Sequence, residues 1–274
     1  MFYLLNIHYV YLLGTMVGTP DFNNTIIANG GIHPDGSPSD GIHPDDATWI
    51  LTSAFIIFTM QSGFGLLEAG TVSAKNESNI MVKNAIDVIF GGLAYWIFGF
   101  AISFGGEGKS NGFTSWEYFF FDSDNEDMAI YAKYFFELSF STTATTIVSG
   151  AMAERVDIKA YMAFSFFNTI SYAFPAHWMW DDSGFLKKMG AVDVAGGGPV
   201  HLVGGVSAIV AAVMLGPRKN KFDEHGRPKQ MPMASPTNVL LGTFMLWWGW
   251  LGFNCGSTFG TSGDKWKIAA RCVH

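Results

Sequence analysis

Charged residues are scarce in this chain of 274 amino acids. Lys, Arg, Asp and Glu together make up 14% of the sequence, whereas a typical soluble domain contains about a quarter. The charges avoid several long apolar blocks, and aromatic residues reach 16%. A soluble globular domain is therefore excluded as the main architecture. The blocks predict an all-α polytopic membrane protein.

The sequence is also poor in cysteine and contains no run of basic residues. Its two cysteines, Cys255 and Cys272, are too few for a disulfide framework and lack the spacing of a metal-binding motif. The net charge of −7 arises from acidic residues in the expected loops, so it does not indicate a nucleic-acid partner. We predict no metal, no cofactor and no nucleic acid.

Lysine and arginine are absent from the first 20 residues, which are apolar and aromatic. This segment is short for a membrane span, and it lacks the basic start of a signal peptide. Neither interpretation is favoured, and a cleaved signal stays an open alternative. A polar loop follows, and residues 1–47 are predicted to lie outside the membrane domain.

That loop carries the sequence GIHPD twice, at 31–35 and 41–45. Its two histidines, His33 and His43, are candidate metal ligands. A tract rich in Pro, Gly and Asp is more typical of a flexible loop, and we favour that interpretation.

Six apolar blocks are long enough to cross a bilayer, which takes about 20 helical residues. They define a transmembrane domain over 48–260, followed by a tail over 261–274. The predicted spans are Thr48–Glu68, Asn79–Phe104, Ala129–Ala153, Ala160–Trp180, Pro199–Gly216 and Asn238–Phe259.

The distribution of basic residues sets the orientation of these spans. One set of connections holds most of them and is expected in the cytoplasm. The other set holds Lys109, Lys133, Lys187 and Lys188 with most of the acids. The amino end is then extracellular, and the protein is expected in the cell membrane. The cytoplasmic set comprises Lys75, Lys83, Arg155, Lys159, Arg218, Lys219, Lys221, Arg227 and Lys229.

One histidine, His201, lies in the small-residue, apolar segment 193–216. An imidazole facing lipid is costly, so it is expected to face other helices or a narrow pore. We favour a pore-lining or proton-relay role over a satisfied interhelical histidine. Gly204, Ala208 and Ala212 recur every four residues, which predicts the close approach of a second helix.

Three further groups are expected at a similar depth: Phe140, Trp180 and Ser257. Two aromatic faces and a hydroxyl suit a small desolvated cation, because cation–π attraction contributes about 2 kcal/mol in a dry site. Taken separately, Trp180 fits the interfacial aromatic belt and Phe140 fits plain packing. The periodicity of the sequence alone does not show that these three side chains meet.

Polar groups elsewhere favour packing over transport. Glu68 ends the first span near the inner surface, which indicates a helix-end or helix-packing role. The third span carries a run of hydroxyls, whose interhelical hydrogen bonds contribute about 0.6 kcal/mol each; a hydrophilic pore wall is the alternative. The run is Ser139, Ser141, Thr142, Thr143, Thr145 and Thr146.

Several long segments resemble the ammonium transporter family (Amt, Mep and Rh proteins), and the Amt branch most. The resemblance runs from about Asp46 to Arg271. It is carried by QSGFGLLEAGTVSAKNESNIMVKN, FSTTATTIVSGAMAER, FPAHWMW, DVAGGGPVHLVGG and WWGWLGFNCGSTFG.

The resemblance implies a recruitment site for ammonium formed by Trp180, Phe140 and Ser257. Phe140 and Phe253 match the two stacked phenylalanines of the family's gate. Ammonium is expected to lose a proton near these rings, after which neutral ammonia passes down an apolar lumen. A bare cation is costly in such a lumen, whereas ammonia is not.

Two further roles follow from the resemblance alone. Asp193 matches an acid that supports the site structurally, and His201 matches the first of two pore histidines. The family fold has eleven helices in two inverted halves and is trimeric. This chain resembles the first half plus one helix, and it stops where the seventh helix is expected to begin.

This departure leaves three functions to weigh. We favour part of a full ammonium transporter over a non-conducting regulatory or sensing subunit that joins full-length transporters. An intramembrane enzyme using His201 with Asp193 or Glu68 is disfavoured, because no serine–histidine or metal-ligand pattern accompanies them. Cys255 stands where relatives carry another small residue.

Overall fold

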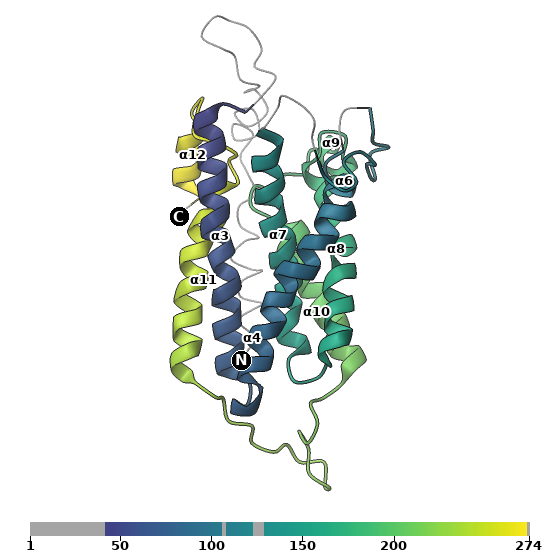
Figure 1. Cartoon of the computed structure of the whole chain (residues 1–274), viewed down its shortest axis with the longest axis vertical. Coiled ribbons are helices and arrows are strands. Elements are labelled where there is room, and N and C mark those ends of the chain that lie inside the picture. Colours follow the sequence, from purple (N-terminus) through teal and green to yellow (C-terminus); the bar gives the residue numbers. More distant parts are fainter. Residues whose placement is uncertain (1–41, 106–107, 123–128, 273–274) are drawn as a thin grey trace, which may run out of the picture.

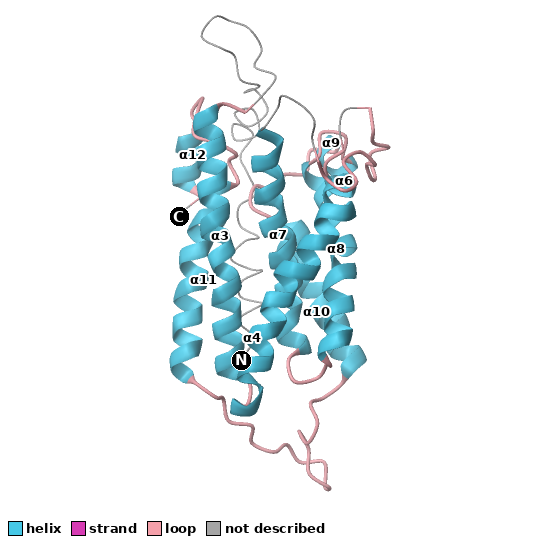
Figure 2. Cartoon of the chain, in the orientation of Figure 1, coloured by secondary structure: helices cyan, strands magenta, loops and turns pink. Residues whose placement is uncertain are grey.

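In the part of the chain that the structure describes, six long helices stand side by side in one bundle (Figures 1 and 2). The computed structural model describes residues 42–105, 108–122 and 129–272. The helical elements are α3 Pro44–Thr71, η1 Ala74–Asn76, α4 Glu77–Ile86, η2 Asp87–Gly91, α5 Gly92–Ala94, η3 Tyr95–Gly99, α6 Phe100–Ser103, α7 Ala129–Met152, α8 Ile158–Trp180, α9 Phe185–Lys188, η4 Gly197–Leu202, α10 Val203–Leu215, α11 Pro236–Gly256 and α12 Lys265–Arg271.

Each predicted span coincides with one of the long helices, so the predicted all-helical membrane architecture is confirmed. The elements from η1 to α6 form one continuous helix, Ala74–Ser103, that contains two π-helical turns. This helix, α3 and Gly197–Leu215 are long and apolar enough to cross a membrane. The other three long helices, α7, α8 and α11, are 24, 23 and 21 residues long.

The helix pair α3 and α11 is packed tightly along its length (Figure 1). Glycines make this possible, because a Cβ on Gly242 would lie 2.4 Å from the backbone nitrogen of Leu67. A Cβ on Gly70 would likewise lie 2.6 Å from the carbonyl oxygen of Ser235. The predicted close approach of a helix to the 204–212 row also occurs. A Cβ on Gly204 would meet Ile147 at 2.9 Å.

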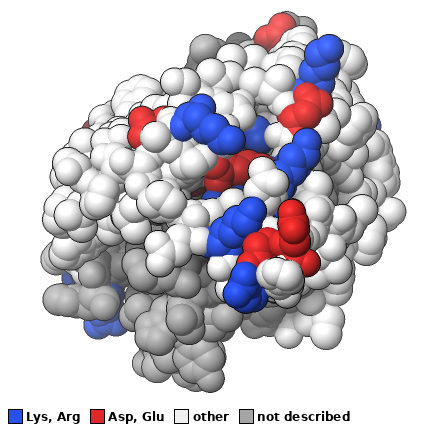
Figure 3. Space-filling model, turned by 90° about the horizontal axis from the view of Figure 1, so that it is seen from below, with Lys and Arg blue, Asp and Glu red and all other residues white. Residues whose placement is uncertain are grey.

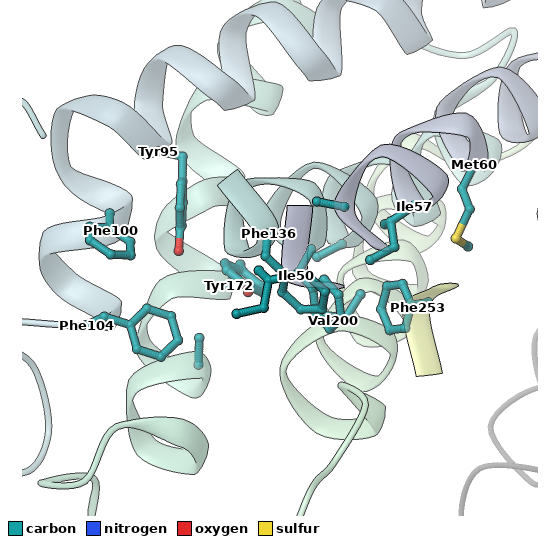
Figure 4. Packing of buried hydrophobic residues seen from close by; sticks show 14 of the residues in the cluster. Ile50, Ile57, Met60, Tyr95, Phe100, Phe104, Phe136, Tyr172, Val200 and Phe253 are labelled. Carbon is teal, nitrogen blue, oxygen red and sulfur yellow. The ribbon is translucent and has the colours of Figure 1, made fainter. Parts of the chain in front are cut away.

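Helix α7 runs through the middle of the bundle and lies against α3, α8 and α10. The apolar core around it combines aliphatic residues of α3 with aromatic residues from several helices (Figure 4). Its hydroxyls serve packing, as the sequence favoured. Thr146 donates to Gln61 of α3, Ser149 donates to Glu68 of α3, and Asn168 of α8 donates to Thr145.

Two of the lysines counted with the connections lie inside helices, as the predicted spans Asn79–Phe104 and Ala129–Ala153 imply. Lys83 is fully buried in α4, where its Nζ donates to the carbonyl oxygen of Val156. Lys133 lies in the first turns of α7, with its Nζ 4.2 Å from the centre of the Phe104 ring. Long basic side chains at span ends can reach a polar partner from within the helix, and the composition of the loops did not reveal this.

Of the two candidate metal ligands, only His43 lies in the described residues. His43 caps α3, because its Nδ1 accepts a hydrogen bond from the backbone of Asp45 at 3.3 Å. His33 and the apolar segment 1–20 lie outside the described residues. No group of three His, Cys, Asp or Glu residues suited to a metal occurs where the structure is described.

One end of the bundle, here called the basic end, carries the connections 72–76, 153–157 and 217–235. Lysines and arginines gather on it around acidic side chains (Figure 3). Glu154 joins all three connections. It accepts hydrogen bonds from the backbone of Ser73 at 3.1 Å and from Asn76 at 2.7 Å, and also from the Ser73 hydroxyl and Arg218.

We expect Glu154→Gln to lower the free energy of unfolding by about 2 kcal/mol at neutral pH, because it removes charge-assisted hydrogen bonds. Burial would raise the pKa of Glu154, but the bonds from Ser73, Asn76 and Arg218 outweigh it and lower the pKa from 4.5 to about 2. The contribution is therefore complete above pH 4.5 and is lost as the pH falls toward 2. Denaturant unfolding in detergent between pH 3 and 7 checks this; a difference that does not shrink in acid contradicts it.

Candidate functional site

The turn before η4 is organised by Asp193. Its carboxylate accepts hydrogen bonds from three consecutive backbone N–H groups, those of Gly196 at 2.6 Å, Gly197 at 3.1 Å and Gly198 at 2.6 Å. Gly196 has a φ of +79°, a left-handed conformation that glycine adopts without strain. A carboxylate at a helix N-terminus satisfies donors that have no partner within the helix. The turn is thereby held in one shape.

The same turn positions Trp180. The indole Nε1 donates to the carbonyl oxygen of Asp193 at 2.8 Å, which fixes the ring at the end of α8. The Trp180 ring meets Phe140 of α7 at a centroid distance of 5.8 Å and an angle of 71°. Asp193 thus shapes the turn with its carboxylate and orients the tryptophan with its carbonyl group.

Two phenylalanine rings stack beside this tryptophan. The centroids of Phe140 and Phe253 are 3.9 Å apart, and the ring planes differ by 13°. Both side chains are buried among apolar neighbours, as Figure 4 shows for Phe253 near Val200. The pair lies between Trp180 and His201, so a molecule passing from one to the other would have to displace the rings.

His201 lies on the other side of the phenylalanine pair. Its ring centre is 5.5 Å from that of Phe253 and 5.0 Å from that of Trp250, with the Trp250 ring nearly parallel at 9°. The side chain is 8% exposed, and its Nε2 has no hydrogen-bond partner among the described residues. A buried ring nitrogen of this kind can exchange a hydrogen bond with a small polar molecule.

Sequence reasoning did not single out Trp250. It precedes Phe253 by three residues on α11, and residues at this spacing share a helix face. This spacing was the signal that would have placed both rings on the side of α11 that faces His201.

Ser257 is connected to these rings by a hydrogen bond to the main chain of Phe253. It caps α11, and its hydroxyl donates to the carbonyl oxygen of Phe253 at 2.7 Å. The hydroxyl hydrogen is therefore used, while the oxygen keeps lone pairs that can accept a hydrogen bond. The structure brings Phe140, Phe253, Trp180 and His201 into one row of ring contacts and adds Ser257 one helical turn beyond Phe253.

The acids weighed as partners of His201 are occupied elsewhere. Asp193 accepts from the three glycine N–H groups, and Glu68 accepts from Ser149 at 2.8 Å and Asn84 at 3.2 Å. Glu68 thus joins α3 to α4 and α7, the packing role that the sequence favoured.

Comparison with known proteins identifies relatives of this chain. The profile of the Ammonium Transporter Family matches residues 48–273. The putative ammonium transporter 3 of Caenorhabditis elegans is 48% identical over 256 residues, covering 90% of this chain and 36% of that protein. A sensor Amt protein of known structure gives a TM-score of 0.72 at 34% identity, covering 80% of this chain and 56% of its own. Mep2 of Candida albicans gives 0.70 at 26% identity, covering 83% and 51%.

The bundle and these likenesses define a polytopic membrane protein. The chain belongs to the ammonium transporter family, as its motifs predicted. It spans about half or less of the length of the relatives that it matches.

Proposed function

We propose that this chain forms the substrate-entry half of a transporter that moves ammonium or ammonia across the cell membrane. The observation that carries the proposal is the row of ring contacts from Trp180 through Phe140 and Phe253 to His201. It supports a path that begins at an aromatic cation site and ends at a buried imidazole.

In this proposal Trp180, Phe140 and Ser257 bind ammonium. The ring faces attract the cation, and the Ser257 oxygen accepts one of its N–H groups. At the stacked phenylalanines the cation transfers a proton to water on the Trp180 side, because a bare charge is costly in an apolar lumen. Neutral ammonia then passes the stacked pair and exchanges a hydrogen bond with the free Nε2 of His201.

The proposed orientation follows the positive-inside rule. The basic end faces the cytoplasm, while the end with Trp180 and Ser257 faces the exterior, as does the chain's amino end. By its family resemblance the complete transporter is a homotrimer in the plasma membrane.

A transport assay tests the proposal. Cells without ammonium uptake of their own express the chain alone and, in parallel, fused to the remaining half of the Caenorhabditis elegans relative. We expect the fusion to accumulate labelled methylammonium. Absence of uptake in both cases, with surface expression verified by labelling, rejects the proposal.

Trp180→Leu is expected to reduce uptake by the fusion about 30-fold, the equivalent of a cation–π contribution of about 2 kcal/mol. Trp180→Phe keeps an aromatic face and is expected to retain most of the activity. Trp116→Leu is the matched control, because Trp116 is a tryptophan 49% exposed in a loop. Equal uptake by Trp180→Leu and Trp116→Leu would remove Trp180 from the site.

A second function is favoured by the match to a protein described as a sensor Amt protein. In this alternative the chain is a non-conducting regulatory or sensing subunit that assembles with full-length transporters. Co-purification of the tagged chain with a full-length relative, together with a change in the uptake by that relative, supports it. Recovery of the chain without any partner contradicts it.

A further inference from the structure

A second polar cluster lies apart from the ring row, nearer the basic end of the bundle. It joins α3, the α4–η2 helix, α7 and α8. Asp87 Oδ2 accepts hydrogen bonds from Tyr161 at 2.8 Å and from Thr146 at 3.1 Å. Glu68 is linked to the same helix through Asn84. Asp87 opens a π-helical turn, a distortion that is often found at functional sites.

The cluster carries an unbalanced charge when its groups have their usual ionisation. Glu68, Asp87 and Lys83 are 3%, 0% and 0% exposed. The two carboxylates act on each other electrostatically, and Lys83 acts on both. Two negative charges against one positive charge leave one negative charge buried, which costs several kcal/mol within a membrane domain.

The hydrogen bonds of the cluster are also incomplete. The second oxygen of Asp87, Oδ1, and the side-chain oxygen of Asn84 are buried acceptors with no partner among the described residues. The buried Gln61 Nε2 and Ser165 Oγ also have none, and the Ser165 hydroxyl acts on the Asp87 carboxylate. Thr146 has one hydroxyl hydrogen but contacts two acceptors, Gln61 at 2.7 Å and Asp87. Buried polar atoms without partners are rare, and each calls for an explanation.

We propose that the Glu68–Asp87 pair is a proton-binding site that holds one proton at neutral pH and exchanges it with water at the basic end. One proton cancels the buried charge. On Asp87 Oδ1 it also supplies a donor three residues from Asn84, on the same helix face. The inference goes beyond the proposed function, because it concerns residues outside the ring row and holds whether or not the chain conducts.

The remaining charged and titratable neighbours are compatible with this site. From α8, the Tyr161 hydroxyl donates to Asp87. Lys83 reaches away from the carboxylates to the carbonyl oxygen of Val156 at the basic end and lies 5.2 Å from the Tyr161 ring centre. Asp157, at the start of α8, acts on Lys83. Tyr161 and Lys83 lead from Asp87 toward the 153–157 turn, so this turn is the surface at which the site exchanges its proton with water.

Infrared difference spectroscopy of the purified full chain in detergent tests the site directly. The wild-type protein at neutral pH is expected to show the carbonyl band of a protonated carboxyl group, and raising the pH should convert it to a carboxylate signal. Asp87→Asn resembles the protonated acid in shape, so the variant should fold and lose this pH-dependent conversion. If the proton rests on Glu68 instead, Glu68→Gln should be the variant that loses the pH-dependent conversion.

Glu224→Gln is the matched control, because Glu224 is exposed on the 217–235 connection. It should leave the band unchanged. Glu137 is a buried acid of α7 bonded to Tyr172, so a band from it would survive substitution of the pair. Persistence of the full pH-dependent signal in the Glu68→Gln, Asp87→Asn double variant overturns the proposal. A signal that follows Na⁺ or K⁺ concentration instead of pH also overturns it, since a metal cation would then balance the charge.

The same spectra separate this inference from the transport proposal. Loss of uptake in the Trp180→Leu variant should leave the carboxyl band intact. Absence of the band in wild-type protein rejects the proton site and leaves the ring row untouched.

Discussion

Asp193→Ala should lower the free energy of unfolding by about 3 kcal/mol and abolish uptake by the fusion protein. Three backbone N–H groups lose their acceptor, at roughly 1 kcal/mol or more each. The turn that carries the bond to Trp180 then loses its shape. Asp193→Asn keeps one acceptor oxygen, so an intermediate loss is expected. Denaturant unfolding in detergent and labelled methylammonium uptake measure the two effects.

The control for Asp193 is Asp182→Ala. The Asp182 side chain is 99% exposed and pairs with Lys187 at 2.7 Å, a surface ion pair that contributes at most about 1 kcal/mol. Uptake should be unchanged in this variant. If Asp193→Ala proved as stable and active as Asp182→Ala, the carboxylate would have no structural role in the turn.

Gly242→Ala is expected to destabilise the bundle by about 3 kcal/mol, the upper range for overpacking. The new Cβ would lie 2.4 Å from the Leu67 nitrogen and 2.6 Å from the Gly63 oxygen. Both are backbone atoms, so the contact can be relieved only by separating α3 from α11. Thermal unfolding of the purified protein measures the loss.

Gly205→Ala is the matched helical control. A Cβ there meets no atom within 4 Å, and replacing a helical glycine with alanine stabilises a helix by about 0.5–1 kcal/mol. Opposite signs for the two variants are therefore expected. Equal effects would show that helix propensity, rather than the α3–α11 contact, governs position 242.

The long helices could be predicted from the sequence because each corresponds to one apolar block between polar connections. Local distortions of these helices could not be predicted. The π-helical turns that begin at Asp87 and Tyr95 lie within the single predicted span Asn79–Phe104, where no proline or break in the apolar pattern marks both of them. Lys83 shows the same limit, since a lysine near the end of a span is read as a loop charge until its partner is known.

The candidate site was predicted in part. His201 was singled out because a histidine in an apolar helix is unusual, and the motifs of the family supplied Phe140, Phe253, Trp180, Ser257 and Asp193. Their roles in transport stay predictions. Trp250 was overlooked because tryptophan is common in membrane helices, so its residue type alone carried no signal. The Asp87 cluster depends on contacts among four helices, which no single segment encodes.

The hydrogen bonds that Glu154 accepts from Ser73 and Arg218 have a consequence for biosynthesis. Ser73 and Glu154 are separated by 81 residues, and Arg218 follows Glu154 by 64 more. A chain that grows from its amino end therefore brings the first two partners together while α10 is still unmade. Helices α3, α4 and α7 can therefore be joined at the basic end before α10 is made, and Arg218 then connects the later helices to them.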